Sequence, residues 1–315
     1  MSVAAQAPAP VTVGIRVPHE MFVDGAASLR NGLKAVVASG VDRLCIGDHV
    51  SFHGGRGFDG LVQATALAAL CDLEILTAVY LLPLRHPVPV SRQVNSLAQL
   101  APGRFVFGVG VGGEDPNEVR MCGVDPTTRG RRMDESLGIV RELLDGQIVT
   151  RHGGFFEIDD ASIRPRLQRP VPVVVGGRSE AALRRAGRLA EGYLAIWVSP
   201  DRYARSVNTV QQYALDAGRQ GVGWRHGLQV WAGFGSSPST ARPLLAAAME
   251  TLYQTPFEKF ERTTPYGTPA DVAAFLADFV AVGCREFNII PVAATAQESI
   301  ESVAEVRRLL RSSVA

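Results

Sequence analysis

The chain has 315 residues, and its 32 Lys and Arg residues nearly balance its 31 Asp and Glu residues, for a formal charge of +1. This balance predicts neither nucleic acid nor a membrane surface as a partner, because both select a strongly basic face. No apolar stretch has the length of a membrane span, and the first residues lack the pattern of a secretion signal, so a cytoplasmic protein is expected. The four scattered cysteines have no metal-ligand spacing and are expected to be reduced thiols.

Apolar runs and helical periodicity alternate along the chain, after an Ala- and Pro-rich stretch at residues 1–10 that we expect to be a flexible tail. Strands are predicted at residues 11–17, 43–46, 73–79, 104–110, 173–175, 193–198, 228–234 and 286–291. Helices are predicted at residues 24–39, 58–71, 88–101, 130–144, 181–188, 201–218, 241–253, 271–282 and 298–310. Residues 11–315 are therefore expected to form a single domain.

Strands followed in turn by helices leave two architectures, a closed barrel or an open doubly wound sheet. The count of eight strands and a chain just over barrel size favour the (β/α)8 TIM barrel, an α/β fold. Two insertion segments interrupt the repeat: residues 147–158 suggest a hairpin, and residues 255–268 an irregular, lid-like stretch. In such a barrel, the chemistry is expected where the strands end and the following loops begin.

One strand end, Gly176-Gly177-Arg178-Ser179, passes directly into a helix. Glycine lets a ligand approach the backbone, and the first turn of a helix offers unpaired amides and partial positive charge. The segment therefore predicts an anion site, most plausibly for a phosphate. The alternative is a plain strand-to-helix turn capped by Ser179.

A second glycine-rich strand end, residues 108–113, has the formal spacing of a dinucleotide fingerprint. A true fingerprint opens at once into a helix and has an acidic residue about 20 positions later. Neither condition is met, and Pro116 indicates a wide loop whose bare backbone lies against a flat or anionic ligand. Two glycine-lined strand ends could face one cofactor, which favours the phosphate interpretation.

Polar and aromatic side chains follow the other strands. After the second strand, His49 could donate a hydrogen bond or exchange a proton, and Asp48 could fix its tautomer or cap the loop; a solvated loop is the alternative. Arg85 could bind an acid group, although its neighbours suggest a turn into the next helix. Further candidates at strand ends are His19, His53 and Trp197, whereas Trp231 is expected in the core. No metal-ligand cluster stands out.

Four segments together resemble the bacterial luciferase-like superfamily: residues 82–88, 101–112, 129–135 and 172–186. Within it, the chain is most similar to the branch that uses the deazaflavin coenzyme F420. The resemblance covers about residues 11–310 and implies a (β/α)8 barrel with the cofactor ring at the carboxyl ends of the strands. The phosphate contacts it implies are Gly176, Gly177, Arg178 and Ser179, with Val111 and Gly112 opposite.

The resemblance also implies a non-proline cis peptide bond at Ala78-Val79 beside the ring, and a role for Asp48-His49, with the histidine near the reactive ring carbon. It implies an F420-dependent oxidoreductase that transfers a hydride between the cofactor C5 and a small organic substrate, commonly as a homodimer. Its sugar-phosphate dehydrogenases have a tryptophan where this chain has His53, so glucose 6-phosphate is not the expected substrate. The alternatives are a two-component monooxygenase that uses reduced FMN and a flavin-binding barrel without turnover.

Overall fold

The computed structural model describes residues 10–312. The tail expected at residues 1–10 therefore lies, apart from Pro10, outside the described residues. Every predicted strand and helix is present within a few residues of its expected ends.

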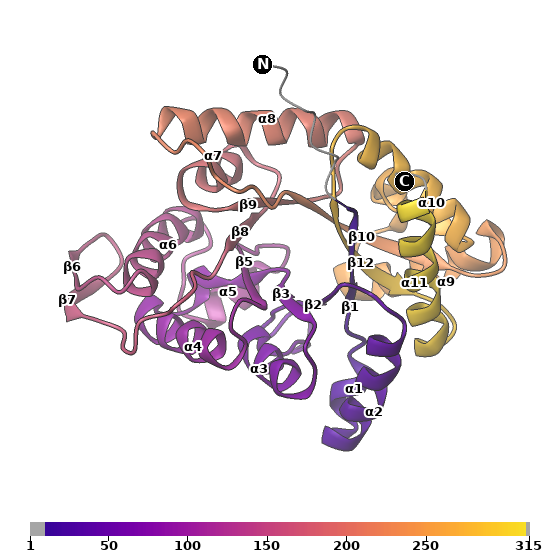
Figure 1. Cartoon of the computed structure of the whole chain (residues 1–315), viewed down its shortest axis with the longest axis horizontal. Coiled ribbons are helices and arrows are strands. Elements are labelled where there is room, and N and C mark those ends of the chain that lie inside the picture. Colours follow the sequence, from indigo (N-terminus) through magenta and orange to yellow (C-terminus); the bar gives the residue numbers. More distant parts are fainter. Residues whose placement is uncertain (1–9, 313–315) are drawn as a thin grey trace, which may run out of the picture.

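Eight parallel strands form a closed barrel, seen at the centre of Figure 1. Each strand pairs with the next, and the pairings of β12 with β1 and of β9 with β10 close the ring. This confirms the (β/α)8 TIM barrel. In order around the ring, the strands are β1 (Thr12–Arg16), β2 (Arg43–Ile46), β3 (Glu74–Thr77), β5 (Phe105–Gly110), β8 (Val173–Gly176), β9 (Gly192–Ile196), β10 (Gly227–Phe234) and β12 (Glu286–Val292).

Helices surround this barrel (Figure 1). They are α1 (Glu20–Val23), α2 (Gly25–Ala38), α3 (Gly60–Leu70), α4 (Pro87–Leu100), α5 (Pro116–Met121), α6 (Arg129–Leu144), α7 (Glu180–Leu189), α8 (Pro200–Asp216), α9 (Pro238–Tyr253), α10 (Pro269–Ala281) and α11 (Ala296–Ser312). Several begin with a Ser, Thr or Asp cap followed by proline at the first turn, an arrangement that satisfies free amides and presets the backbone. Within residues 10–312, no helix is long and apolar enough to cross a membrane.

The two expected insertions lie outside the barrel repeat. Strands β6 (Val149–His152) and β7 (Glu157–Ala161) form an antiparallel hairpin that projects from the side of the molecule in Figure 1. The segment after α9 contains two 3-10 turns, Phe257–Lys259 and Glu261–Thr263, and ends in β11 (Tyr266–Gly267), which pairs with β10.

The wide loop expected around Pro116 is in fact partly helical. Asp115 caps α5 by accepting a hydrogen bond from the Asn117 amide at 2.9 Å, and Pro116 occupies the first helical position. Proline is favoured there because its missing N–H would have no helical partner. The proline that suggested an irregular loop is therefore a helix start.

Inside the amino-terminal end of the barrel, two arginines and two glutamates form a closed network. Arg43 binds Glu74 at 2.5 Å and Glu286 at 2.7 Å, and Arg225 binds the same carboxylates at 2.9 and 3.1 Å. Beyond this network toward the mouth, apolar side chains fill the barrel; they are Cys45, Leu76, Ala78, Val106, Val174 and Leu194. The charged layer and the apolar layer together fill the barrel interior below its mouth.

This network predicts a dependence of stability on pH. Burial alone would raise the pKa of Glu74, but hydrogen bonds and charges from Arg225 and Arg43 hold it below its ordinary value. Such a carboxylate stabilises the fold above the ordinary glutamate pKa of about 4.3, and this stabilisation is lost as the pH falls through the lowered folded-state pKa. Glu74→Gln should lower the unfolding free energy by about 1–3 kcal/mol at neutral pH and flatten the loss of stability at acid pH.

Urea denaturation at a series of pH values measures both effects. Glu305→Gln is the matched control, because Glu305 pairs with Arg308 on the exposed face of α11 and should contribute little. The prediction would be contradicted if the unfolding free energy fell with acid pH as steeply in Glu74→Gln as in the unsubstituted chain.

Candidate active site

The side chain of Val79 lies across the mouth of the barrel, just after β3. A Cβ added at Gly110 would overlap Val79 Cγ2, and one added at Gly176 would approach Val79 Cγ1 to 2.8 Å. Two bare strand ends, from β5 and β8, therefore make room for this isopropyl group. The non-proline cis peptide bond expected at Ala78-Val79 is present. The result is an apolar surface at the centre of the mouth, flanked by backbone without side chains.

Gly110→Ala is expected to destabilise the protein by about 1–3 kcal/mol, because an added methyl group must displace Val79 in a packed barrel. The midpoint of urea denaturation measures this. Gly138→Ala on α6 is the control: nothing lies within 4 Å of an added Cβ there, and alanine in a helix should stabilise by about 0.5–1 kcal/mol. If Gly110→Ala and Gly138→Ala had equal midpoints of urea denaturation, the prediction would be wrong, and Val79 would have room to move away from the added methyl group.

The glycine turn after β8 has the conformation that its sequence predicts. Gly177 has φ +141°, which side-chain-bearing residues rarely adopt, and Ser179 caps α7 by accepting a hydrogen bond from the Ala182 amide at 3.3 Å. The neighbouring strand β5 leads into Val111 and into Gly112, which has φ +61°. Both glycine-lined strand ends therefore lie side by side, as expected.

A cavity of about 510 Å³ opens beside this turn. The guanidinium of Arg178 lies 5.3 Å from the ring centre of Trp197, and the Phe260 ring packs against the same indole with the centroids 4.9 Å apart. Trp197 has φ +51°, uncommon for a bulky residue and typical of functional sites. The cavity is lined by Arg178, Trp197, Ser199, Thr255, Lys259, Phe260, Arg262 and Thr263, a set with three cations and no acid.

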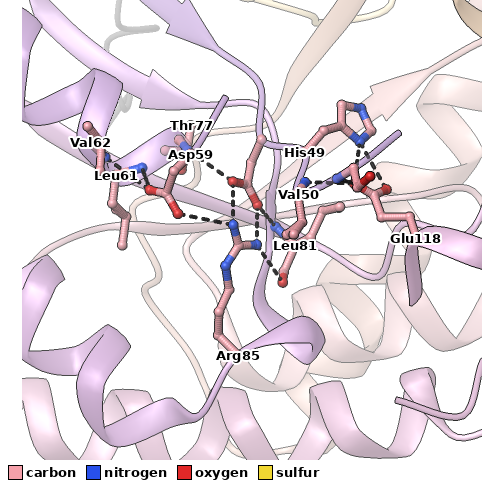
Figure 2. A network of polar contacts seen from close by, with 12 residues as sticks. His49, Val50, Asp59, Leu61, Val62, Thr77, Leu81, Arg85 and Glu118 are labelled. Atoms are coloured by element: carbon pink, nitrogen blue, oxygen red, sulfur yellow. Dashed lines mark hydrogen bonds and ion pairs between the residues drawn. The ribbon is translucent and has the colours of Figure 1, made fainter. Parts of the chain in front are cut away.

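His49 stands at the mouth, on the loop after β2, with its side chain 28% exposed. Its Nδ1 contacts Glu118 Oε2 at 3.1 Å, and its ring stacks on Phe52 with the centroids 4.2 Å apart. Glu118 also accepts hydrogen bonds from the amides of Val50 and Ser51 (Figure 2). Burial alone would raise the pKa of Glu118, but these hydrogen bonds and that of His49 lower it. The ring orientation is thus fixed and Nε2 is left for other partners.

The side chain of Asp48 does not fix the tautomer of His49, which is one of the two roles that the sequence left open for it; His49 contacts Glu118 instead. Its carboxylate is fully buried, binds Arg85 at 2.5 and 2.8 Å, and accepts hydrogen bonds from the amides of Gly60 and Leu81. Figure 2 shows Arg85 also reaching the Leu81 carbonyl and Asp59, and Asp59 lies across the network from His49. Of the two roles the sequence left open, the structure supports the capping of the loop. The acid group that Arg85 binds belongs to the protein itself.

Two further histidines have different surroundings. His19 stacks on Phe58 with the centroids 5.5 Å apart, and this desolvation together with the charges of Arg16 and His49 lowers the pKa of His19 to about 4. His53 lies next to Asp115, which accepts its backbone amide at 2.9 Å. His19 is therefore neutral at physiological pH, and His53 is held against the start of α5.

Aromatic side chains from β10 and α9 complete the mouth. Trp231 is buried, as expected, and its indole Nε1 donates to the Tyr253 hydroxyl at 3.1 Å. Tyr253 in turn contacts Trp197 and Phe52 edge to face. Burial raises the pKa of Tyr253 to about 12, so the hydroxyl stays protonated. A series of ring contacts thus runs from Trp197, in the cavity beside the glycine turn, through Tyr253 and Phe52 to His49.

Sequence reasoning missed Glu118, Tyr253 and Arg16 as members of this site. Glu118 follows Asp115 and Pro116 at the spacing of a capped helix start, which would have placed it on an ordered element. Arg16 is the last residue of β1, and alternate residues of a strand face the same side. This alternation could have indicated that Arg16 faces the barrel interior. No local signal distinguishes Tyr253, the last residue of a long helix.

The chain is similar to several known proteins. An uncharacterized protein of Mycobacterium bovis is 34% identical over 206 residues, which cover 59% of this chain and 71% of that protein. An F420-dependent glucose-6-phosphate dehydrogenase of Nakamurella multipartita is 33% identical over 194 residues, covering 59% of this chain and 56% of the dehydrogenase. A 4-hydroxyprotoasukamycin monooxygenase of Streptomyces nodosus subsp. asukaensis is 34% identical over 186 residues, covering 56% of this chain and 50% of the monooxygenase.

Among solved structures, an F420-dependent secondary alcohol dehydrogenase superposes with a TM-score of 0.84 and 18% identity, covering 96% of this chain and 99% of the dehydrogenase. At this identity, the likeness concerns the fold. A family model described as luciferase-like monooxygenase matches residues 19–311, nearly the whole chain. The chain therefore belongs to the luciferase-like monooxygenase family.

Proposed function

We propose that the protein is a coenzyme F420-dependent oxidoreductase that transfers a hydride between the deazaflavin and a small organic substrate. The observation that carries the proposal is the apolar surface of Val79, set between two glycine strand ends and directly beside a glycine turn that begins a helix. A flat ring joined to a phosphate needs these two features side by side. His49, the conformationally fixed histidine at the mouth, supplies a polar group for the substrate.

The residues present fit such a cofactor. Ala78 and the Val79 side chain would support the ring. Gly176 and Gly177 would let the phosphate approach the backbone, where the first amides of α7 and the helix dipole favour an anion. Arg178 and Ser179 flank this turn, and Val111 and Gly112 lie on the adjacent strand end. The cations of the neighbouring cavity suit the acidic groups that extend from the phosphate.

When bound, the deazaflavin would supply the hydride chemistry at its C5. The chain's own part is to bind, orient and exclude water. The Phe52 ring and the Glu118 carboxylate hold His49 in one orientation, so that its free Nε2 can donate to or accept from the substrate's oxygen or nitrogen. The aromatic side chains around Tyr253 provide a dry wall against the substrate. We expect a homodimer in the cytoplasm, as is common for this family.

A reduced-FMN-dependent two-component monooxygenase is the second candidate. Similarity to 4-hydroxyprotoasukamycin monooxygenase supports it, and the same glycine turn would serve an FMN phosphate. Similarity to F420-dependent glucose-6-phosphate dehydrogenases and the cationic cavity beyond the turn favour the deazaflavin. A flavin-binding barrel without turnover is disfavoured, because His49 and its two supports are all in place.

Fluorescence titration of the purified chain with coenzyme F420, FMN and, under anaerobic conditions, reduced FMN tests the proposal. We expect selective binding of F420, and weaker binding in Gly110→Ala than in Gly138→Ala, because only the former displaces Val79. Preference for reduced FMN would move the assignment to the monooxygenase. Binding of none of the three would leave only the fold assigned.

A further inference from the structure

Arg16, the last residue of β1, faces the inside of the barrel mouth. Successive residues of a strand alternate between its two faces. Gly14 faces inward, where an added Cβ would contact Cys45 Sγ at 2.9 Å, so Arg16 faces inward two residues nearer the mouth. Its guanidinium occupies the space left by Gly47, since a Cβ at that position would overlap the guanidinium nitrogens. The glycine immediately before Asp48-His49 therefore makes room for this arginine.

This guanidinium has no acidic partner. Across residues 10–312, no carboxylate forms an ion pair with Arg16, and its one hydrogen-bond contact is with His19 Nε2 at 3.5 Å. By contrast, Arg43, Arg85 and Arg225 each bind two carboxylates of the chain. Burial lowers the pKa of Arg16, and the nearby Tyr253 and Cys45 only partly oppose this. A partly buried positive charge that the fold leaves uncompensated is costly unless a ligand supplies the counter-charge.

The position of Arg16 separates it from the proposed phosphate turn. In the ring of eight strands, β1 lies opposite β8, which carries the glycine turn. Strand β2, whose loop carries His49, is the direct neighbour of β1. His19, which touches Arg16, is also close enough to His49 for the two charges to interact. Arg16 therefore lies on the side of the mouth where the substrate, rather than the phosphate, is expected.

We propose that Arg16 binds a carboxylate of the substrate, so that the enzyme acts on organic acids whose reacting carbon lies near His49. The planar guanidinium matches the two oxygens of a carboxylate. Tyr253, which lies near Arg16 and packs against Phe52 and Trp231, suits an apolar or aromatic body. The reaction depends on the proposed F420 function, whereas the anion site depends only on the arrangement of Arg16, Gly47 and His19.

Isothermal titration calorimetry with benzoate and with benzamide tests the inference, because the two probes share size and shape and differ in charge. The full-length chain loaded with F420 should bind benzoate about ten- to a hundredfold more tightly than benzamide. Arg16→Met should abolish this preference and leave the F420 affinity unchanged, and Arg16→Lys should retain part of it. Gly47→Ala should weaken benzoate binding without removing a charge, because the added methyl group displaces the guanidinium.

Arg30→Met is the matched control, since Arg30 is an exposed cation on α2, outside the barrel mouth, and should affect neither the preference nor the F420 affinity. Equal affinities for the two probes in the unsubstituted chain would overturn the inference, as would a preference that survives Arg16→Met or disappears in Arg30→Met. If Arg16→Met lost affinity for F420 but kept the preference for benzoate over benzamide, the result would overturn the inference and assign Arg16 to the cofactor site. The same titrations without F420 test the anion site separately from the proposed F420 function. If the chain does not bind F420 but still prefers benzoate in an Arg16-dependent way, the anion site stands and F420 is rejected as the cofactor.

Discussion

Replacing His49 with alanine is expected to lower turnover by about a hundredfold or more, the usual contribution of a positioned acid–base group, while changing F420 affinity little. The reason is that His49 stands over the mouth with its Nε2 free, on the loop after β2, whereas the glycine turn follows β8 on another part of the ring. Steady-state kinetics and fluorescence titration of the same preparation measure the two quantities. Equal losses of turnover and cofactor affinity would remove His49 from the chemistry.

Two variants sharpen this test. His53→Ala removes the neighbouring histidine, which lies against Asp115, and should leave turnover nearly unchanged. Glu118→Gln keeps the shape of the group that positions His49 but removes its charge, so we expect a smaller loss than in His49→Ala. A larger loss in Glu118→Gln than in His49→Ala would mean that the carboxylate itself acts on the substrate.

Asp48→Ala is expected to destabilise the fold by about 3–5 kcal/mol, because it leaves the Arg85 guanidinium without its main partner in a buried site. The substitution also leaves the amides of Gly60 and Leu81 without their acceptor. Denaturant unfolding measures the change. Asp72→Ala is the control, since the Asp72 carboxylate is fully exposed and lies 3.7 Å from Arg104.

The same variant decides between the two roles that the sequence left open for Asp48. If Asp48 caps the loop, turnover per folded molecule should remain within about an order of magnitude of the unsubstituted chain. Unchanged stability together with abolished turnover would contradict the structural role and return Asp48 to the chemistry.

The fold could be predicted from the sequence because its signals are local. Eight apolar runs each precede a helical period, and the closing of eight such units into a barrel follows from right-handed crossovers. The glycine turn at Gly176-Gly177 was also predictable, because two glycines between a strand and a capped helix allow the positive φ that the turn adopts at Gly177. The cis bond at Ala78-Val79 followed from the family resemblance and from no local signal.

The partners of the polar residues could not be predicted in this way. Glu118 meets His49 across 69 residues, and Arg85 meets Asp48 across 37. Such pairs form because the closed barrel brings particular loops together. The hydrophobic periodicity of the sequence does not indicate which loops these are. Sequence proximity suggested Asp48 as the partner of His49, but Asp48 binds Arg85 and His49 contacts Glu118. The inward direction of Arg16 emerges only once the barrel interior is defined.

The most direct test of the proposed function is an anaerobic absorbance measurement on the chain loaded with coenzyme F420 and mixed with a panel of alcohols, ketones, enones and organic acids. We predict that the visible absorbance of the deazaflavin changes in step with product in the complete absence of oxygen, and that His49→Ala slows this change. Product that forms only with reduced FMN and oxygen, with the deazaflavin absorbance unchanged throughout, would contradict hydride transfer by F420 and identify a monooxygenase.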